Sequence, residues 1–402
     1  MTSTKECIQL EEKYGAKNYN PLDVVISKGK GIWVEDVEGN KYMDFLAAYS
    51  ALNQGHNHPR LVKALTEQAQ KLSLTSRAFR NDQLPYFEKE LCELTGYEMM
   101  LPMNSGAEAV ETAIKAARKW GEKEKGVEQN KGEIIACSGN FHGRTTTIIS
   151  FSDEEQYRDG FGPFTPGFHV IEYNNVDALR EAINENTVAF MVEPIQGEGG
   201  VVVPDQDYMK KVEEICKENN VLLIADEIQS GLGRTGKMFA CDHEDVKPDM
   251  ITIGKALSGG MYPVSAVVGS AEVLGVFNPG DHGSTYGGNP IASAVGREAL
   301  KVLVEEGLIE KSAELGKYFH EKLETIDSPY VDFVRGKGLW IGIVLKQPAR
   351  PFCKALMDKG ILAKDTHGNV IRIAPPLVIS KEEIDQAFEA IKDVLTDDSF
   401  KL

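Results

Sequence analysis

The sequence predicts an α/β protein of two domains, and three observations lead to this prediction. Segments 189–195 and 221–226 are typical of strands buried on both faces, and a helical pattern over 207–219 joins them, which makes the strands parallel. In the C-terminal part, strands and helices no longer alternate, which is an α+β pattern. At 402 residues the chain also exceeds the roughly 250–300 residues that one hydrophobic core usually serves.

The composition is that of an ordinary globular protein, with 42% hydrophobic and 26% charged residues. The net charge of −17, from 44 basic and 61 acidic residues, argues against nucleic acid or an anionic membrane as a partner. No apolar run approaches the roughly 18 residues of a membrane-spanning helix, and the first residues match neither a signal nor a transit peptide. The 6 cysteines are scattered, which indicates reduced thiols, so we expect a cytoplasmic protein.

Other segments have weaker patterns. Residues 1–45 predict a small antiparallel sheet around a turn at 38–40, and Tyr19 and Tyr49 flank this sheet. Each tyrosine on its own is more often a packing residue. Further strands are predicted at 264–268, 331–344 and 370–373, and helices at 291–306 and 381–395.

Asp226 and Lys255 are the strongest candidates for chemistry. Asp226 ends one buried strand, and Lys255 follows a second apolar run at 250–253. Ligands bind at the carboxyl ends of strands in open α/β sheets, so both side chains are expected at one edge. A pyridoxal phosphate enzyme needs this pair: a lysine for the Schiff base and an acid that keeps the pyridine nitrogen protonated. Taken singly, such an Asp is more often a turn former and such a Lys a solvated surface residue.

Ser105 and Glu108 form a capping-box pattern ahead of a strongly helical run over 109–120. The free N–H groups of such a helix start suit a phosphate, and Gly106 lets a ligand approach the backbone closely. Capping boxes also open many ordinary helices, so this pattern gains weight only from its neighbours.

A predicted strand at 133–137 precedes Phe141 and Arg144, which could supply a stacking ring and a carboxylate clamp. The alternative is a core phenylalanine and a surface ion pair. The strand at 189–192 ends in Glu193. Three strands that end in polar residues describe a single ligand-binding edge.

Two motifs are rejected. Residues 231–238 match G-x-G-x-x-G and G-x-x-x-x-G-K, but Met238 cannot hold magnesium and no helix opens there. A glycine-rich loop that packs over the active-site edge is the simpler interpretation, and a nucleotide-dependent oxidoreductase or ATPase is the competing class of function. His56 and His58 lack a third metal ligand at useful spacing, so we expect no metal site.

The chain resembles the class III (fold type I) pyridoxal phosphate aminotransferases. The motifs that carry the resemblance are 105–108, 193–194, 226–229, 254–255 and 284–290. It is most similar to the ornithine δ-aminotransferases, over nearly its whole length, in 14–19, 49–56 and 372–377. The implied fold has a large domain, 49–290, with a mostly parallel seven-stranded sheet, and a small α+β domain from both chain ends, 1–48 and 291–402.

The resemblance assigns the cofactor, pyridoxal 5′-phosphate, to residues of the predicted edge. Lys255 would form the Schiff base and shuttle the proton, and Asp226 would pair with the ring nitrogen. The other cofactor-binding residues would be Gln229 at the ring hydroxyl, Phe141 stacked on the ring, and Ser105, Gly106 and Ala107 at the phosphate. Thr285 would join the phosphate from the neighbouring subunit of a homodimer.

The resemblance also implies the reaction. The δ-amino group of ornithine would pass to 2-oxoglutarate in two half-reactions, giving glutamate 5-semialdehyde, which cyclises to pyrroline-5-carboxylate, and glutamate. Arg144 would clamp the ornithine α-carboxylate and Tyr19 its α-amine, whereas Arg372 would bind the α-carboxylate of glutamate or 2-oxoglutarate once Glu198 releases it. The remaining substrate-binding candidates are Tyr49 and Glu193.

The nearest alternatives are N-acetylornithine and 4-aminobutyrate aminotransferases. Tyr19 distinguishes them, because neither competing substrate has a free α-amine. Gly199, where the family often has Ala, and Ser105, where Thr is common, are departures from the family pattern that touch no proposed catalytic role.

Overall fold

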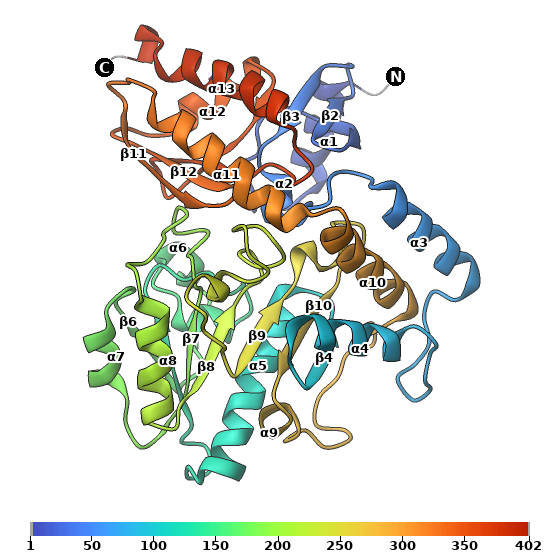
Figure 1. Cartoon of the computed structure of the whole chain (residues 1–402), viewed down its shortest axis with the longest axis vertical. Coiled ribbons are helices and arrows are strands. Elements are labelled where there is room, and N and C mark those ends of the chain that lie inside the picture. Colours follow the sequence, from blue (N-terminus) through green and yellow to red (C-terminus); the bar gives the residue numbers. More distant parts are fainter. Residues whose placement is uncertain (1–2, 401–402) are drawn as a thin grey trace.

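The computed structural model describes residues 3–400, and a seven-stranded sheet forms its centre (Figure 1). The strand order is β4-β10-β9-β8-β7-β5-β6. Neighbours from β9 to β6 pair in parallel, whereas β10 runs antiparallel to both β9 and β4. This confirms the mostly parallel sheet implied by the resemblance. The strands are β4 (Met99–Met103), β5 (Glu133–Cys137), β6 (Phe168–Ile171), β7 (Thr187–Val192), β8 (Leu222–Asp226), β9 (Met250–Ile253) and β10 (Ser265–Gly269).

The central strands are apolar throughout because helices cover both faces of the sheet. Along β5, Ile135 and Cys137 belong to one hydrophobic cluster and Ile134 and Ala136 to another. The first cluster contains the apolar face of α8 (Tyr208–Glu218), and the second contains that of α5 (Gly106–Trp120). The alternation of side chains along a strand therefore divides the core between the two faces.

The two ends of the chain meet in a second region, where blue and red segments lie together in Figure 1. Strand β3 pairs in parallel with β13 and so joins residues near 43 to residues near 361. The domain boundaries expected near residues 48 and 290 stay a prediction. The strands of this region are β1 (Ile26–Lys30), β2 (Trp33–Asp36), β3 (Lys41–Asp44), β11 (Val331–Lys337), β12 (Trp340–Leu345), β13 (Ile361–Leu362), β14 (Lys364–Thr366) and β15 (Val370–Ile373).

Helices surround both regions. The remaining ones are α1 (Thr4–Tyr14), α2 (Ala47–Ser50), α3 (Pro59–Lys71), α4 (Leu84–Thr95), α6 (Glu155–Arg158), α7 (Val176–Ala182), α9 (Ala271–Leu274), α10 (Pro290–Glu305), α11 (Leu308–Glu324), α12 (Arg350–Asp358) and α13 (Lys381–Leu395). Across residues 3–400, none of the helices is long and apolar enough to span a membrane.

The elements predicted from pattern are mostly confirmed. The crossover helix is α8, the capping box opens α5, and the antiparallel sheet near the N-terminus is β1-β2-β3. Several helices are absent from the sequence prediction, and α1 and α11 are two of the longer ones. Packing of its apolar side against the rest of the chain explains α11, whereas α1 has no buried residue and begins at a Ser3 cap.

The glycine-rich loop over 231–237 was expected to pack over the active-site edge, and the structure places it elsewhere. It is buried against the C-terminal region, where Arg234 donates to the carbonyl oxygens of Leu339 and Pro375, at 2.9 and 2.6 Å. A Cβ at Gly236 would lie 2.8 Å from the backbone of Ala313, and φ there is +87°. Glycine is thus required by close packing with α11 and by backbone conformation, and no phosphate-binding loop forms.

Candidate active site

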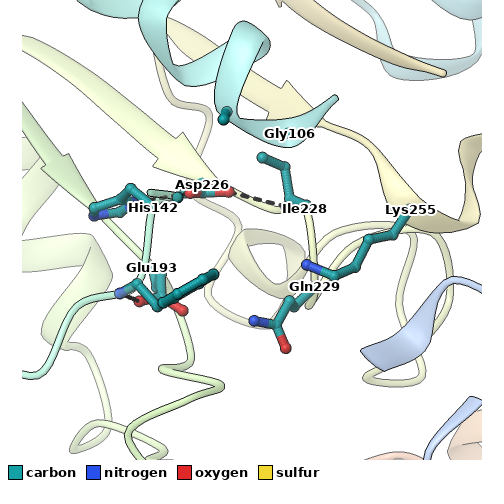
Figure 2. A pocket seen from close by; sticks show the side chains of 10 residues that line it. Gly106, His142, Glu193, Asp226, Ile228, Gln229 and Lys255 are labelled. Carbon is teal, nitrogen blue, oxygen red and sulfur yellow. Dashed lines mark hydrogen bonds and ion pairs between the residues drawn. The ribbon is translucent and has the colours of Figure 1, made fainter. Parts of the chain in front are cut away.

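A pocket of about 270 Å³ opens at the carboxyl ends of β5, β7 and β8 (Figure 2). This is the edge predicted from the sequence. The pocket is lined by Gly106, Ala107, Phe141, His142, Gly143, Glu193, Asp226, Ile228, Gln229 and Lys255. In Figure 2 Lys255 enters from the side opposite His142 and Asp226, and its amine points into the space between them.

Asp226 lies at the end of β8, with its carboxylate held on three sides. Its Oδ1 accepts hydrogen bonds from the Ile228 N–H at 3.1 Å and the Thr252 hydroxyl at 3.0 Å. Its Oδ2 lies 2.7 Å from Nδ1 of His142. Only 5% of Asp226 is exposed, so these contacts fix the acid in one orientation toward the pocket.

His142 is a pocket residue that sequence reasoning missed as a functional candidate. It is completely enclosed, and burial alone lowers the pKa of an imidazole, but the hydrogen bond and charge of Asp226 raise the pKa of His142 above its usual value. The partner lies 84 positions away in the sequence. No spacing signal links two residues so far apart, and only the sheet brings them together.

Lys255 follows β9 in a left-handed conformation, with φ of 44°. Side chains with a Cβ rarely adopt this region, and such strain concentrates at functional sites. Burial lowers the pKa of the Lys255 amine to about 8, against the opposing charge of Asp226. An amine with this pKa is partly neutral near physiological pH and is therefore available as a nucleophile.

The start of α5 forms the end of the pocket opposite Glu193. Ser105 and Glu108 make both bonds of the capping box, at 3.2 and 2.7 Å, so the Ser105 side chain serves the helix and does not line the pocket. The backbones of Gly106 and Ala107 do line it. A Cβ at residue 106 would lie 3.0 Å from Ile228, so glycine keeps the approach to the helix start open.

Glu193 accepts hydrogen bonds from the N–H groups of Phe141 and Gly197, at 2.8 and 3.1 Å. It is fully enclosed, and burial raises the pKa of its carboxyl to about 7, although the neighbouring His142 acts in the opposite direction. Its contact with the Phe141 backbone fixes the segment that carries the aromatic ring into the pocket. Glu193 therefore shapes the site as well as lining it.

Arg372, Glu198 and Gln229 form one network. Arg372 on β15 donates to Glu198 at 2.8 Å and to the Gln229 side-chain oxygen at 2.8 Å. Its side chain is only 1% exposed, and burial lowers the pKa of the guanidinium while Glu198 opposes this. A Cβ at Gly197 would lie 2.6 Å from the same Gln229 oxygen. The network extends from the C-terminal region to the pocket wall through Gln229.

Tyr49 lies beside this network in an uncommon backbone conformation. Residues Ala47 to Ser50 have φ between 47° and 72°, a left-handed turn that the Asp44 carboxylate caps through two N–H bonds of 2.9 Å. The guanidinium of Arg372 lies 5.5 Å from the centre of the Tyr49 ring. Burial, Glu198 and nearby Tyr19 raise the pKa of Tyr49, whereas Tyr19 itself is 74% exposed.

Arg144 and Thr285 lie outside the enclosed part of the pocket. The Arg144 guanidinium lies 3.7 Å from the centre of the Tyr157 ring and 5.5 Å from that of Phe141. Tyr157 therefore orients the expected carboxylate clamp, and sequence reasoning did not single it out. Thr285 is exposed on the loop after α9 and does not line the pocket of its own chain.

Comparison with known proteins decides the family. The Aminotransferase class-III family model matches residues 14–395. The chain belongs to the class III aminotransferase family. This confirms the fold class, the aminotransferase activity and the cofactor, pyridoxal 5′-phosphate, that the sequence implied.

Three relatives place this aminotransferase more closely. The ornithine aminotransferase of Brevibacillus brevis is 58% identical over 395 residues, covering 98% of this chain and 99% of that protein. A structure of the ornithine aminotransferase of Toxoplasma gondii with partial occupancy of PLP is 46% identical, with a TM-score of 0.96 and coverage of 98% and 94%. A structure of the acetylornithine aminotransferase of Elizabethkingia anophelis is 48% identical, with a TM-score of 0.90 and coverage of 98% and 99%.

The pocket of this aminotransferase fits the cofactor. One enclosed space holds a helix start for a phosphate, an amine with lowered pKa, and a fixed carboxylate on the opposite side. Over residues 3–400, no group of three or more His, Cys, Asp or Glu side chains is arranged to hold a metal ion.

Proposed function

We propose that this aminotransferase transfers the δ-amino group of L-ornithine to 2-oxoglutarate. The products would be glutamate 5-semialdehyde, which cyclises to pyrroline-5-carboxylate, and glutamate. The observation that carries the proposal is the ion pair between the buried Arg372 and the partly exposed Glu198, which Gln229 connects to the pocket. An arginine that a glutamate can neutralise in one half-reaction and release in the other suits an enzyme whose two substrates place their carboxylates differently.

The cofactor would be held by residues that line the pocket. Lys255 is the amine for its aldehyde, Asp226 would keep its ring nitrogen protonated, and Gln229 would face the ring hydroxyl. When bound, pyridoxal phosphate supplies an electron sink and a carrier for the amino group. Phe141 would pack on the ring, and Gly106 and Ala107, behind the cap of Ser105, would receive the phosphate.

The ornithine end of the site would use residues at the mouth of the pocket. Arg144, oriented by the Tyr157 ring, would bind the α-carboxylate, and Tyr19 would bind the α-amine. While ornithine is bound, Glu198 keeps Arg372 neutralised. In the second half-reaction Arg372 would bind the α-carboxylate of 2-oxoglutarate after Glu198 turns away. Tyr49 and Glu193 would define the walls on either side.

Lys255 would also move the proton between the substrate carbon that carries the amino group and C4′ of the cofactor. Burial lowers the pKa of this amine to about 8, so it can give or take a proton near neutral pH. The raised pKa of Glu193, about 7, reduces the negative charge near the lysine at neutral pH. Both shifts come from burial and support a role for Lys255 as the base.

We further propose a cytoplasmic homodimer. Thr285 is exposed and lies outside its own pocket, which is consistent with a contribution to the phosphate site of a neighbouring subunit. The six cysteines are free thiols, which fits a reducing compartment. A monomeric mass in sedimentation at micromolar concentration would contradict the dimer.

The test is the visible absorption spectrum of the purified holoenzyme without a keto acid. L-Ornithine is expected to bleach the cofactor band faster than N-acetylornithine or 4-aminobutyrate, and 2-oxoglutarate should restore it. Tyr19→Phe is expected to weaken ornithine use and improve 4-aminobutyrate use, because only ornithine has a free α-amine. Faster bleaching by N-acetylornithine than by ornithine would show that ornithine is not the preferred substrate. If Tyr19→Phe leaves the bleaching rates unchanged, Tyr19 does not bind the α-amine.

A further inference from the structure

The segment that carries Tyr19 has little support of its own. Residues 15–25 lie between α1 and β1 and form neither helix nor strand, and residues 15–21 are all exposed. Its internal backbone bonds are short-range, from Asn18 to Ala16 and from Val24 to Leu22. Such a segment samples many conformations unless another part of the chain holds it.

Arg350 is the side chain that holds it. It stands at the first position of α12, and its Nη2 donates to the carbonyl oxygens of Asn20 and Pro21, at 2.9 and 3.0 Å. Its Nη1 donates to Asp365 on β14 at 3.1 Å. The side chains of Arg350 and Asp365 are each 26% exposed, so the ion pair is shielded from much of the solvent.

The hairpin of β14 and β15 links this anchor to the substrate residues. Arg372 pairs with Lys364 across the hairpin, and Asp365 is the next residue along β14. Thr366 then donates its hydroxyl to the Glu198 carbonyl oxygen at 2.8 Å. One short hairpin therefore positions the Arg372–Glu198 pair directly and the backbone next to Tyr19 through Arg350.

We propose that Arg350 is a positioning residue for recognition of the substrate α-amine, acting by fixing residues 19–21 against the β14–β15 hairpin. The inference rests on the proposed function, because it assigns Tyr19 to the amine. Arginine is required because its planar fork serves a carboxylate and two carbonyl oxygens together, which a lysine ammonium on a flexible stem matches poorly.

The first experiment measures steady-state kinetics of Arg350→Ala and Arg350→Lys. We expect Arg350→Ala to raise the KM for ornithine roughly tenfold, the effect of losing a charge-assisted hydrogen bond, with kcat and the KM for 2-oxoglutarate within about twofold of wild type. The KM for ornithine of Arg350→Lys should lie between that of wild type and that of Arg350→Ala. Arg180→Ala, which removes a surface arginine paired with Asp177, is the matched control and should change nothing.

A double-mutant cycle separates positioning from general loosening. If Arg350 acts through Tyr19, Arg350→Ala in the Tyr19→Phe background should leave the KM for ornithine at the value of Tyr19→Phe alone. Additive effects would overturn the proposal. So would an unchanged KM for ornithine in the single variant.

Hydrogen exchange of the holoenzyme gives a readout that does not depend on turnover. Exchange across residues 16–22 should become faster in Arg350→Ala and stay unchanged in Arg180→Ala. Unchanged exchange in Arg350→Ala would overturn the anchor. If wild-type enzyme bleaches with another amine and not with ornithine, the proposed function fails and the α-amine role with it, whereas the exchange rates still decide whether Arg350 holds the segment.

Discussion

Burial changes the charge of individual residues in the pocket, and in opposite directions for acids and bases. It lowers the pKa of the Lys255 amine to about 8 and raises that of the Glu193 carboxyl to about 7. Both groups thus titrate near physiological pH, where a proton is exchanged most readily. Asp226 is held in one orientation by three hydrogen-bonding partners.

The lowered pKa of Lys255 predicts how the apoenzyme takes up its cofactor. Only the neutral amine reacts, and with a pKa of about 8 roughly a tenth of the lysine is neutral at pH 7, against about 0.03% for an ordinary lysine. The rate of pyridoxal phosphate capture should therefore rise with pH, reach half its limit near pH 8 and level off above. Stopped-flow absorbance measures this rate. A rate that keeps rising beyond pH 10 would show an unshifted lysine.

At the scale of single elements, α5 is the one whose start would receive the cofactor phosphate under the proposed function. The capping box satisfies the N–H groups of Glu108 and Ser105, and Gly106 and Ala107, which lie between them at the helix start, line the pocket. The apolar side of the same helix packs on the sheet. Packing thus fixes the helix axis, and the cap fixes the geometry of its first turn.

Removal of this cap should affect stability and cofactor binding together. Ser105→Ala is expected to cost about 1 kcal/mol of unfolding free energy and to weaken the affinity for pyridoxal phosphate several-fold, because the first turn frays. Urea denaturation of the apoenzyme and spectral titration with the cofactor measure the two effects. Ser105→Thr, which keeps a capping hydroxyl, is the control. An unchanged affinity in Ser105→Ala, with stability reduced, would separate the cap from the phosphate site.

For the whole molecule, one buried arginine joins the central sheet to the region made by the chain ends. Arg234 is fully buried and donates to Leu339, Pro375 and the side chain of Asn53, none of which is a carboxylate. Burial, together with the charge of Arg372, lowers the pKa of Arg234 to about 9. The charge of Arg372 thus acts on Arg234, so the joint and the Arg372–Glu198 pair share one electrostatic environment.

Arg234→Ala should destabilise the protein by about 3 kcal/mol or more, because it leaves three buried acceptors without a donor. Equilibrium denaturation in urea measures this loss, with the exposed Arg180→Ala as a control that should stay within about 0.5 kcal/mol of wild type. Arg234→Lys should recover only part of the loss, since an ammonium cannot reach all three acceptors. A loss below about 1 kcal/mol in Arg234→Ala would mean that water replaces the guanidinium at the joint.

The sequence by itself determined five of the central strands (β5, β7, β8, β9 and β10), the crossover helix, the cap of α5 and the edge that holds Asp226 and Lys255, whereas β4 and β6 were not predicted. These follow from local periodicity and from the rule that parallel strands end at one edge, so no distant contact was needed. The tertiary structure alone decided the partners of those residues. His142 meets Asp226 across 84 positions, Arg350 meets Asn20 across 330, and the glycine-rich loop turns inward to α11. Such pairs depend on how whole elements pack, and no spacing along the chain encodes them.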